Sequence, residues 1–318
     1  MSATPPAVIA LDWGSTHLRA WLMDAEGRVQ THRSSGAGAL GLGPIDFDAA
    51  LAALVGDWVA QHPRAALIAC GMVGARGGWC EVPYVDLPAG LETLKQHLRQ
   101  VPTQLGPTLA IVGGLRSTEP DVLRGEETQA LGTGCRDGLL CLPGTHSKWM
   151  RLEAGAVTAF RTWFTGELYE RLGSEGSLAR AFGEPAALDP SAFEEGVALA
   201  LDAPLGQAWL HTFFGFRARV VGAGEPGTRE RARFSGWLIA SELCQALHDP
   251  LLITDAAAAG PRALWLVAAP TLGVWYQRAW RSVWAALPEP LQAEWPPAFQ
   301  EADPACSAQG LYRILRAV

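Results

Sequence analysis

An internal repeat constrains the fold of this chain more than any other feature of its sequence. Residues 8–32 read as an apolar strand, a loop of glycine and hydroxyl residues, a second strand, a tight turn and a third strand. Residues 139–160 repeat that order. Such repetition predicts two related lobes, each with one polar loop pointing into a cleft between them. Two unrelated β-hairpins would produce a similar pattern, and the sequence alone leaves that alternative open.

Elsewhere, apolar residues at helical spacing alternate with short apolar runs, which is typical of an α/β fold. The predicted helices cover 46–59, 91–98, 126–131, 234–247, 272–284 and 308–318, and further strands cover 66–70, 108–112 and 264–267. A stretch rich in glycine and charge, 222–230, is predicted to be an exposed loop, and prolines indicate a connector at 288–297.

Length and composition are those of two ordinary domains. The chain has 318 residues, 49% of them hydrophobic and 18% charged, which is enough for two cores. Its net charge of -7 and the lack of a lysine- and arginine-rich run argue against nucleic acid or an anionic membrane as the partner. With no basic leader and no apolar stretch of about 18 residues, a soluble, cytoplasmic protein is expected. The cysteines and histidines lack metal-site spacing, so the cysteines are expected to be reduced core residues.

The loop that follows the first strand carries residue types suited to a polyphosphate. Asp12, at the strand end, can hold Mg²⁺ through water, and Gly14 lets backbone N–H groups approach phosphate oxygens. Ser15 and Thr16 add hydroxyl donors. A turn closed by an aspartate side chain would have the same sequence, so this loop alone is a weak indication.

The second copy of the repeat carries a similar loop, with Gly144, Thr145, His146 and Lys148. Two opposed phosphate loops are what a clamp around ATP requires. Lys148 would supply a counter-charge, and it is one of only two lysines in the chain, the other being Lys95. A solvated surface lysine is the alternative.

Adjacent acids, Glu126 and Glu127, stand at the start of a predicted helix. In one interpretation they only complement the helix dipole. In the other, one carboxylate accepts or orients the proton of a substrate hydroxyl and the second is its hydrogen-bonding neighbour. One such acid suffices for phosphoryl transfer, which depends mostly on positioning and charge neutralisation. The residues alone leave these readings equal.

A glycine-rich segment, 71–79, follows a buried strand and predicts a shaped loop at the sheet edge where α/β proteins hold ligands. Arg76 or Arg124 could grip a substrate carboxylate with two hydrogen bonds. Trp79 or Tyr84 could cover a sugar chain.

Taken together, these segments resemble the 2-dehydro-3-deoxygalactonokinase family over nearly the whole chain. Four strings are far more specific than the first loop: Gly125–Gln129, Pro143–Trp149, Gly71–Gly74 and Thr165–Leu168. The matching segments, in chain order, are Asp12–Thr16, Leu18–Trp21, Gly71–Gly74, Pro83–Tyr84, Arg124–Gln129, Pro143–Trp149, Phe160–Thr162 and Thr165–Leu168.

The resemblance implies a fold, an activity and a division into lobes. That family belongs to the sugar kinase, Hsp70 and actin superfamily, in which two ribonuclease-H-like lobes close over ATP in a central cleft. The implied activity is Mg-dependent phosphorylation of O6 of 2-dehydro-3-deoxy-D-galactonate by ATP. Residues 1–130 would form the lobe with the sugar-acid site and first phosphate loop. Residues 131–318 would carry the second phosphate loop and the adenosine site, with a last helix that could return to lobe one.

The resemblance also implies residue roles. Asp12 would organise Mg²⁺, and the two glycine-hydroxyl loops would hold phosphates. The base would be an acid at the start of the connecting helix, with Glu127 favoured over Glu126. Residues 165–167 match the family without an assigned role.

One segment departs from the superfamily pattern. The adenosine loop usually carries glycine, whereas Ala268 and Ala269 stand there, so adenine contact is expected at Ala269 with altered affinity. Open alternatives are a kinase of another sugar acid such as 2-dehydro-3-deoxy-D-gluconate, a nucleotide hydrolase, or a sugar-sensing protein without enzymatic activity. A homodimer is also left open.

Overall fold

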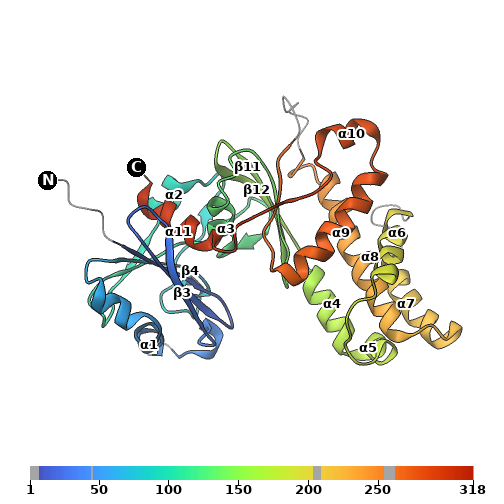
Figure 1. The fold of residues 1–318 in the computed structure, drawn as a ribbon, viewed down its shortest axis with the longest axis horizontal. Coiled ribbons are helices and arrows are strands. Elements are labelled where there is room, and N and C mark those ends of the chain that lie inside the picture. Colours follow the sequence, from blue (N-terminus) through green and yellow to red (C-terminus); the bar gives the residue numbers. More distant parts are fainter. Residues whose placement is uncertain (1–6, 44–45, 203–208, 254–261, 318) are drawn as a thin grey trace. The chain divides into compact units, whose positions relative to one another are not determined.

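The computed structural model describes residues 7–43, 46–202, 209–253 and 262–317. The chain divides into two compact units, each described here by itself (Figure 1). The first comprises Met1–Asp137, Arg151–Ala159 and Ala302–Val318, and the second comprises Gly138–Met150 and Phe160–Glu301. No helix in the described ranges is long and apolar enough to cross a membrane.

The first unit is built on a six-stranded sheet with the order β3-β2-β1-β4-β7-β6. The first three strands form the predicted antiparallel meander, and β4 and β7 continue the sheet in parallel with β1. The strands are β1 (Val8–Trp13), β2 (Leu18–Met23), β3 (Val29–Ser35), β4 (Ala66–Gly71), β6 (Arg99–Val101) and β7 (Leu109–Ile111). Three further strands of this unit form a separate small sheet, with the order β5 (Val85–Asp86), β8 (Leu115–Arg116) and β9 (Val122–Leu123).

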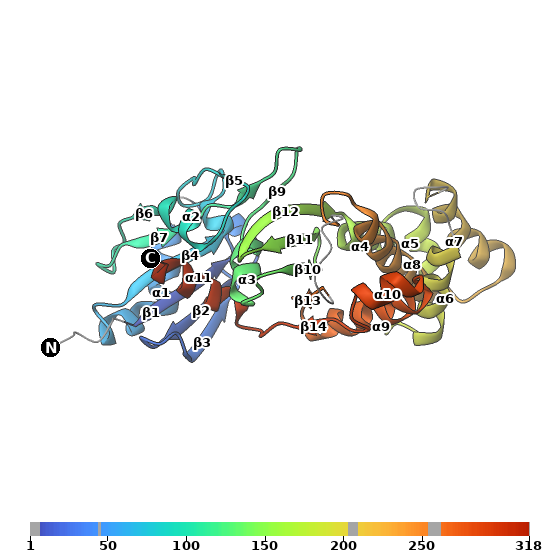
Figure 2. The same cartoon turned by 90° about the horizontal axis from the view of Figure 1, so that it is seen from above.

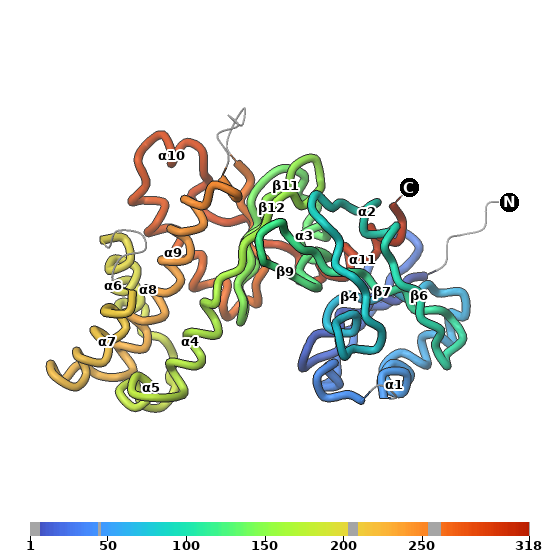
Figure 3. The backbone as a smooth tube through the Cα atoms, turned by 180° about the vertical axis from the view of Figure 1, so that it is seen from behind, coloured from blue at the N-terminus to red at the C-terminus, as the bar shows by residue number. Residues whose placement is uncertain are grey.

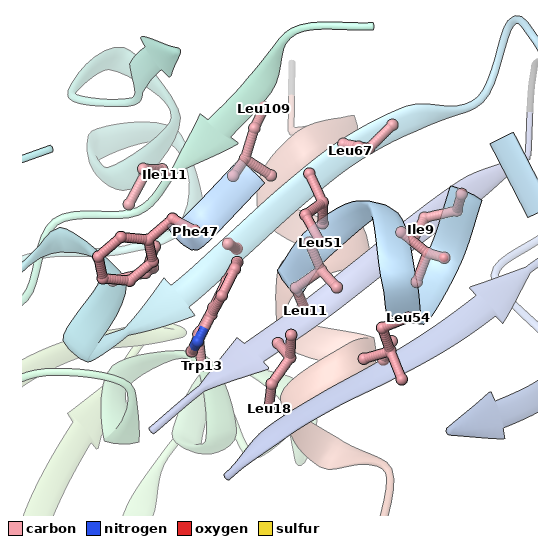
Figure 4. Close-up of a cluster of buried hydrophobic side chains, with 14 of the residues drawn as sticks. Ile9, Leu11, Trp13, Leu18, Phe47, Leu51, Leu54, Leu67, Leu109 and Ile111 are labelled. Carbon is pink, nitrogen blue, oxygen red and sulfur yellow. The ribbon is translucent and has the colours of Figure 1, made fainter. Parts of the chain in front are cut away.

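Strand alternation assigns the side chains of β1 to two different faces of this sheet. Ile9, Leu11 and Trp13 join a buried cluster with Phe47 and Leu51 of α1 (Asp46–Gln61), as Figure 4 shows. The intervening side chains, including that of Asp12, therefore point to the opposite face.

That opposite face is covered by α11 (Cys306–Arg316), which is red in Figure 3 and lies among the blue and cyan elements of its own unit. It packs closely on α3 (Glu126–Gly132), since a Cβ at Gly310 would lie 1.8 Å from the Thr128 carbonyl oxygen. The Tyr312 hydroxyl donates to the carbonyl of Ala25, in the turn between β2 and β3, at 2.6 Å. The short helix α2 (Leu91–Gln96) also belongs to this unit.

The second unit repeats the strand order of the first. Its sheet, in which the stretch Arg151–Ala159 of β11 and β12 is grouped with the first unit, runs β12-β11-β10-β13-β14, visible from top to bottom in Figure 2. This order matches β3-β2-β1-β4-β7 strand for strand. As in the first sheet, the later strands are parallel to the opening strand of the repeat. The strands are β10 (Gly138–Leu142), β11 (Ser147–Glu153), β12 (Ala156–Trp163), β13 (Leu264–Leu266) and β14 (Gln300–Glu301). The predicted repeat is therefore a repeat of topology and not a coincidence of two hairpins.

Helices fill most of the remaining second unit. They are α4 (Thr165–Ser174), α5 (Gly176–Phe182), α6 (Pro190–Asp202), α7 (Trp209–Ala223), α8 (Gly227–His248), α9 (Pro270–Ala286) and α10 (Glu289–Glu294). The predicted exposed loop at 222–230 is wrong in part. The helix α8 begins at Gly227, and Glu230 is fully buried, because Arg233 pairs with its carboxylate and removes the cost of burying a lone charge. The predicted connector at 288–297 contains α10, with proline in its first turn, where a missing N–H costs nothing.

Candidate active site

Asp12 lies at the carboxyl end of β1 with its side chain 8% exposed. Its Oδ2 atom accepts a hydrogen bond from Ser307 of α11 at 3.2 Å and pairs with the Arg19 guanidinium of β2 at 2.9 Å. Burial raises the pKa of Asp12, while Arg19 and Ser307 act to lower it. This carboxylate is thus held firmly in place at the edge of the sheet.

The start of α3 packs against the end of β4, which lies next to the end of β1 in the sheet. Asp12 and Cys70 are register partners on β1 and β4, and the Thr128 hydroxyl lies 3.2 Å from the Cys70 sulfur. Gly125, with φ of 106°, approaches so closely that a Cβ on it would be 3.4 Å from the Gly71 Cα. After burial, the carboxylates of Asp12 and Glu127 are the main causes that raise the pKa of the Cys70 thiol, which places both near it.

Glu127 is fully buried, and half of its carboxyl group has no partner. Its Oε2 atom accepts from the Gly125 N–H at 2.7 Å, whereas Oε1 meets no hydrogen-bond donor within the described part of the chain. Burial, and after it the charge of Glu126, raise the pKa of Glu127 to about 8; backbone hydrogen bonds to its carboxylate and the positive charge of Arg124 offset part of this. A carboxyl group with this pKa is suited to accept a proton near neutral pH.

Glu126 has a different position. It is half-buried, and its Oε2 atom accepts from the backbone N–H of Arg124 at 3.0 Å. That contact closes the turn before α3, which is a structural use of the side chain.

Arg124 is held by its neighbours in a way that leaves two of its guanidinium nitrogens without an acceptor among the described residues. Nη2 donates to the Val82 carbonyl at 2.9 Å, and the guanidinium carbon lies 4.3 Å from the centre of the Tyr84 ring. The other two nitrogens, Nε and Nη1, are buried and meet no acceptor among the residues that the structure describes. Their N–H groups lie on different edges of the planar guanidinium, each completed by Nη2, so a ligand carboxylate could accept from either nitrogen.

The glycine-rich loop, residues 71–79, packs against Arg124 and Val82. A Cβ on Gly74 would lie 3.1 Å from Arg124 Nη1, and the Val82 N–H donates to the Gly74 carbonyl at 2.9 Å. Arg76 of this loop is exposed. Trp79 packs instead on Trp13, with centroids 6.0 Å apart, at the edge of the core cluster beneath α1. The structure therefore unites Arg124 and Tyr84 with Glu127, and it gives Trp79 a packing role.

The first glycine-hydroxyl loop is tied down on its carbonyl side. The Gly14 and Ser15 carbonyls accept backbone N–H groups of Ala39 and Leu40 at 2.9 and 3.1 Å. Ser15 is half-buried, whereas Thr16 is exposed. The Thr16 hydroxyl oxygen lies 2.8 Å from Nδ1 of the His17 ring. The loop is thus fixed in shape while the Thr16 hydroxyl faces solvent.

The second glycine-hydroxyl loop joins β10 to β11. Gly144 is half-buried, and Thr145 and His146 are exposed. The His146 ring bonds to the Glu167 carboxylate at 2.6 Å. Lys148 belongs to β11 and is 5% exposed, with Nζ donating to the His146 carbonyl at 3.1 Å. Lys148 is therefore not the solvated surface lysine that was the alternative.

Ala269 stands at the same sheet edge as this second loop. The Val267 N–H donates to the Cys141 carbonyl at 2.9 Å, which sets the end of β13 beside the end of β10. Ala269 then caps α9. One glycine does lie nearby: Gly273, in the first turns of α9, is buried, and a Cβ on it would lie 3.7 Å from that of Ala268.

The chain is similar over most of its length to a known protein family. Residues 12–288 match the model of a family described as 2-keto-3-deoxy-galactonokinase. The chain belongs to this family. The 2-dehydro-3-deoxygalactonokinase of Escherichia coli K12 is 33% identical over 280 residues, covering 86% of this chain and 89% of that protein. The probable 2-dehydro-3-deoxygalactonokinase of Rhizobium meliloti 1021 is 35% identical over 251 residues, covering 75% and 79%.

A solved structure of the 2-keto-3-deoxy-galactonokinase family agrees with the fold. The Sinorhizobium meliloti protein, assigned as a 2-dehydro-3-deoxygalactonokinase, superposes with a TM-score of 0.78 at 30% identity over 98% of each chain. Together with the repeated strand order, this confirms the predicted fold class, an α/β protein with two ribonuclease-H-like lobes of the actin-like ATPase and sugar kinase type. The enzyme is a carbohydrate kinase.

Sequence reasoning missed several residues around the site. Arg19 and Ser307 contact Asp12, and Glu242 of α8 lies behind the second loop. Arg19 stands seven residues after Asp12 on the next strand of the meander, so antiparallel pairing could have indicated it. Ser307 and Glu242 carry no local signal.

Proposed function

We propose that this enzyme transfers the γ-phosphoryl group of ATP to O6 of 2-dehydro-3-deoxy-D-galactonate. The products are ADP and 2-dehydro-3-deoxy-6-phospho-D-galactonate. The observation that carries the proposal is the presence in one unit of two buried side chains with unsatisfied polar atoms, namely Oε1 of Glu127 and the Nε and Nη1 donors of Arg124. In a member of this kinase family, they supply the base and the carboxylate receptor that a sugar acid needs.

Glu127 is the proposed base. Its ionised Oε1 accepts the O6 proton while O6 forms a bond to the γ-phosphorus and the bond from that phosphorus to the β,γ-bridging oxygen breaks. The electron pair of the broken bond leaves with ADP. Because the transition state for phosphoryl transfer is loose, the enzyme contributes mainly position and charge. A single acid aimed at O6 is sufficient for the proton.

Arg124 is the proposed receptor of the substrate carboxylate, and Tyr84 holds its guanidinium in plane. Arg76 is the weaker candidate because its exposed side chain would have to be ordered on binding. Trp79 is not part of this proposal, since it packs against Trp13 and Phe47.

The two glycine-hydroxyl loops are the proposed phosphate contacts. Gly14, Ser15 and Thr16 form one set, and Gly144, Thr145, His146 and Lys148 form the other. Ala269 is the proposed adenosine contact. Backbone N–H groups and hydroxyls in such loops bind phosphate oxygens, and a lysine adds positive charge.

Asp12 is the proposed holder of Mg²⁺. Among the described residues no group of three or more His, Cys, Asp or Glu side chains could enclose a metal ion. A single buried carboxylate nevertheless fits Mg²⁺, which keeps several waters and is usually held by one or two carboxylates together with substrate phosphates. When bound, the ion would neutralise charge on the phosphates.

We also place the reaction in the cytoplasm. None of the six cysteines, all of which lie in the described ranges, forms a disulfide, as is usual in a reducing compartment.

The decisive experiment is a coupled ADP-release assay with 2-dehydro-3-deoxy-D-galactonate and 2-dehydro-3-deoxy-D-gluconate side by side. Neutral hexoses and a sample without acceptor complete the panel. We expect ADP release to depend on a sugar acid and to be faster with the galactonate epimer. Faster turnover of the gluconate would identify that epimer as the substrate. ADP release without an acceptor would indicate a nucleotide hydrolase, and no turnover with any acceptor would indicate a binding protein without enzymatic activity.

Replacing Arg124 tests carboxylate recognition. Arg124→Lys keeps a positive charge but loses the fork, so we expect KM for the sugar acid to rise about thirtyfold, equivalent to about 2 kcal/mol for a lost charge-assisted pair. KM for ATP should change less than about twofold. Arg76→Lys is the matched control and should change neither value. If Arg76→Lys raises the sugar-acid KM and Arg124→Lys does not, the two arginines exchange roles.

A further inference from the structure

Glu242 is a buried carboxylate that neither the fold nor the proposed chemistry yet explains. It lies in α8, is 1% exposed, and its carboxylate accepts four hydrogen bonds from neutral groups of the second unit. The donors are the Ser147 hydroxyl at 2.6 Å, the Trp149 indole at 2.8 Å, the Tyr276 hydroxyl at 2.9 Å and the Thr165 hydroxyl. Burial raises its pKa, and these donors act to lower it.

A carboxylate in such a place is costly. Burying it without a cation loses hydration, and an apolar side chain of similar volume would serve a purely structural role as well. The structure offers a reason in the identity of the donors. The four donors come from β11, α4 and α9, and a fifth, weaker donor, the Cys141 thiol of β10, lies 3.9 Å from Oε1. These four segments surround the second phosphate loop and include the helix after Ala269.

The donors fix both ends of the second loop. Cys141 lies in the strand that enters residues 143–146, and Ser147 is the first residue after them. Thr165 begins α4, and the next two residues contact the loop itself. The Glu167 N–H donates to the Thr145 carbonyl at 2.9 Å, and a Cβ on Gly166 would lie only 2.2 Å from the Gly144 carbonyl oxygen.

The fourth donor connects the loop to the adenosine side. Tyr276 lies two turns into α9, the helix that Ala269 caps. A single carboxylate thus joins the strand after the phosphate loop, the helix that supports the loop and the helix that begins at the adenosine contact. A change at Glu242 would release these segments from one another.

We infer that Glu242 is a positioning residue for ATP, which holds the second phosphate loop and the start of α9 in the arrangement that binds the nucleotide. This inference rests on the proposed kinase function and goes beyond it, because Glu242 itself touches neither substrate. It also gives the family segment 165–167 a role, which is to carry the support from Glu242 to Gly144 and Thr145.

Three variants test the inference. Glu242→Met leaves the four donors without an acceptor, so we expect the binding-competent loop to be populated about tenfold less and KM for ATP to rise about tenfold. KM for the sugar acid should change less than about twofold. Glu242→Gln keeps the shape and can satisfy hydroxyls that rotate, so it should restore KM for ATP to within about threefold. Tyr276→Phe removes one donor, preserves packing and should weaken ATP binding by a smaller factor.

Glu230→Met is the matched control. Glu230 lies in the same helix, is equally buried and pairs with Arg233. Its loss should lower Tm without changing KM for ATP. Equal effects of Glu242→Met and Glu230→Met on both KM values would show that Glu242 only stabilises the fold and would overturn the inference.

Calorimetry with MgADP separates this inference from the proposed function. If wild type binds MgADP, Tyr276→Phe and Glu242→Met should bind it more weakly even when no sugar acid is turned over. Unchanged MgADP affinity in both variants overturns the inference while the kinase function stands. If Glu242→Met does not fold, Tyr276→Phe alone decides. Absence of nucleotide binding by the wild type would overturn both proposals.

Discussion

Glu127→Gln should lower kcat by roughly two to four orders of magnitude, the usual contribution of a general base. The amide has the size of the carboxyl group and can still accept the Gly125 N–H, so the chain should remain folded. It cannot accept a proton, however. Initial rates at saturating ATP and sugar acid, together with a circular dichroism melt, measure both expectations.

Glu126→Gln is the natural control, because the two residues are adjacent and only Glu127 has a free buried oxygen. We expect its kcat to fall less than about fivefold, since the Arg124 N–H still finds an acceptor. Full activity of Glu127→Gln combined with loss in Glu126→Gln would reverse the assignment of the base.

The pKa of Glu127 near 8 also predicts two pH dependences. The base must be ionised, so kcat/KM should rise with pH towards a plateau above pH 8.

Between the ordinary glutamate pKa of 4.5 and about 8, the folded chain retains a proton on Glu127 that the unfolded chain has lost. The free energy of unfolding should therefore fall as pH rises through that window. Glu127→Gln should lack this decline, and parallel pH dependence of the two proteins in urea titrations would contradict it.

Asp12→Asn is expected to lower kcat by at least about a hundredfold, as loss of a metal organiser does. The amide preserves size and the contact with Ser307 but removes the charge that attracts Mg²⁺ and pairs with Arg19. A raised Mg²⁺ requirement should accompany the loss, which a titration of activity against Mg²⁺ measures. Asp24→Asn, at a half-buried aspartate in the β2–β3 turn of the same meander that pairs with Arg28, should leave both values unchanged. A normal Mg²⁺ dependence in Asp12→Asn would remove Asp12 from the metal role.

Sequence periodicity was sufficient for the strands of both meanders and for β4, β7 and β13, and it found six helices. These are α1, α2, α3, α8, α9 and α11, whereas the short strands β5, β6, β8, β9 and β14 were not predicted. The apolar runs of β1, β4 and β10 are buried on both faces, which produces a clear signal. The glutamate pair was also visible, and burial separates its members by leaving Glu127 inside and Glu126 half-exposed. Resemblance favoured the same residue.

The parts that sequence could not supply depend on contacts between distant segments. Ser307 reaches Asp12 across 295 positions. Glu242 looks like an ordinary polar residue of a helix, because its partners come from four other elements. The helices α4 to α7 were missed, and in α7 the reason is plain: several large apolar residues, such as Leu210 and Phe214, face solvent, so no clean apolar stripe marks its inner side.

The contact between Ser307 and Asp12 bears on how the protein matures during translation. The aspartate leaves the ribosome well before its hydroxyl partner and the helix that covers that face of the sheet, which are made some three hundred codons later. A partly synthesised chain can form the β1–β3 meander but leaves Asp12 uncovered. Competence to handle magnesium nucleotide should therefore arise only when residues 306–316 have been translated and have docked.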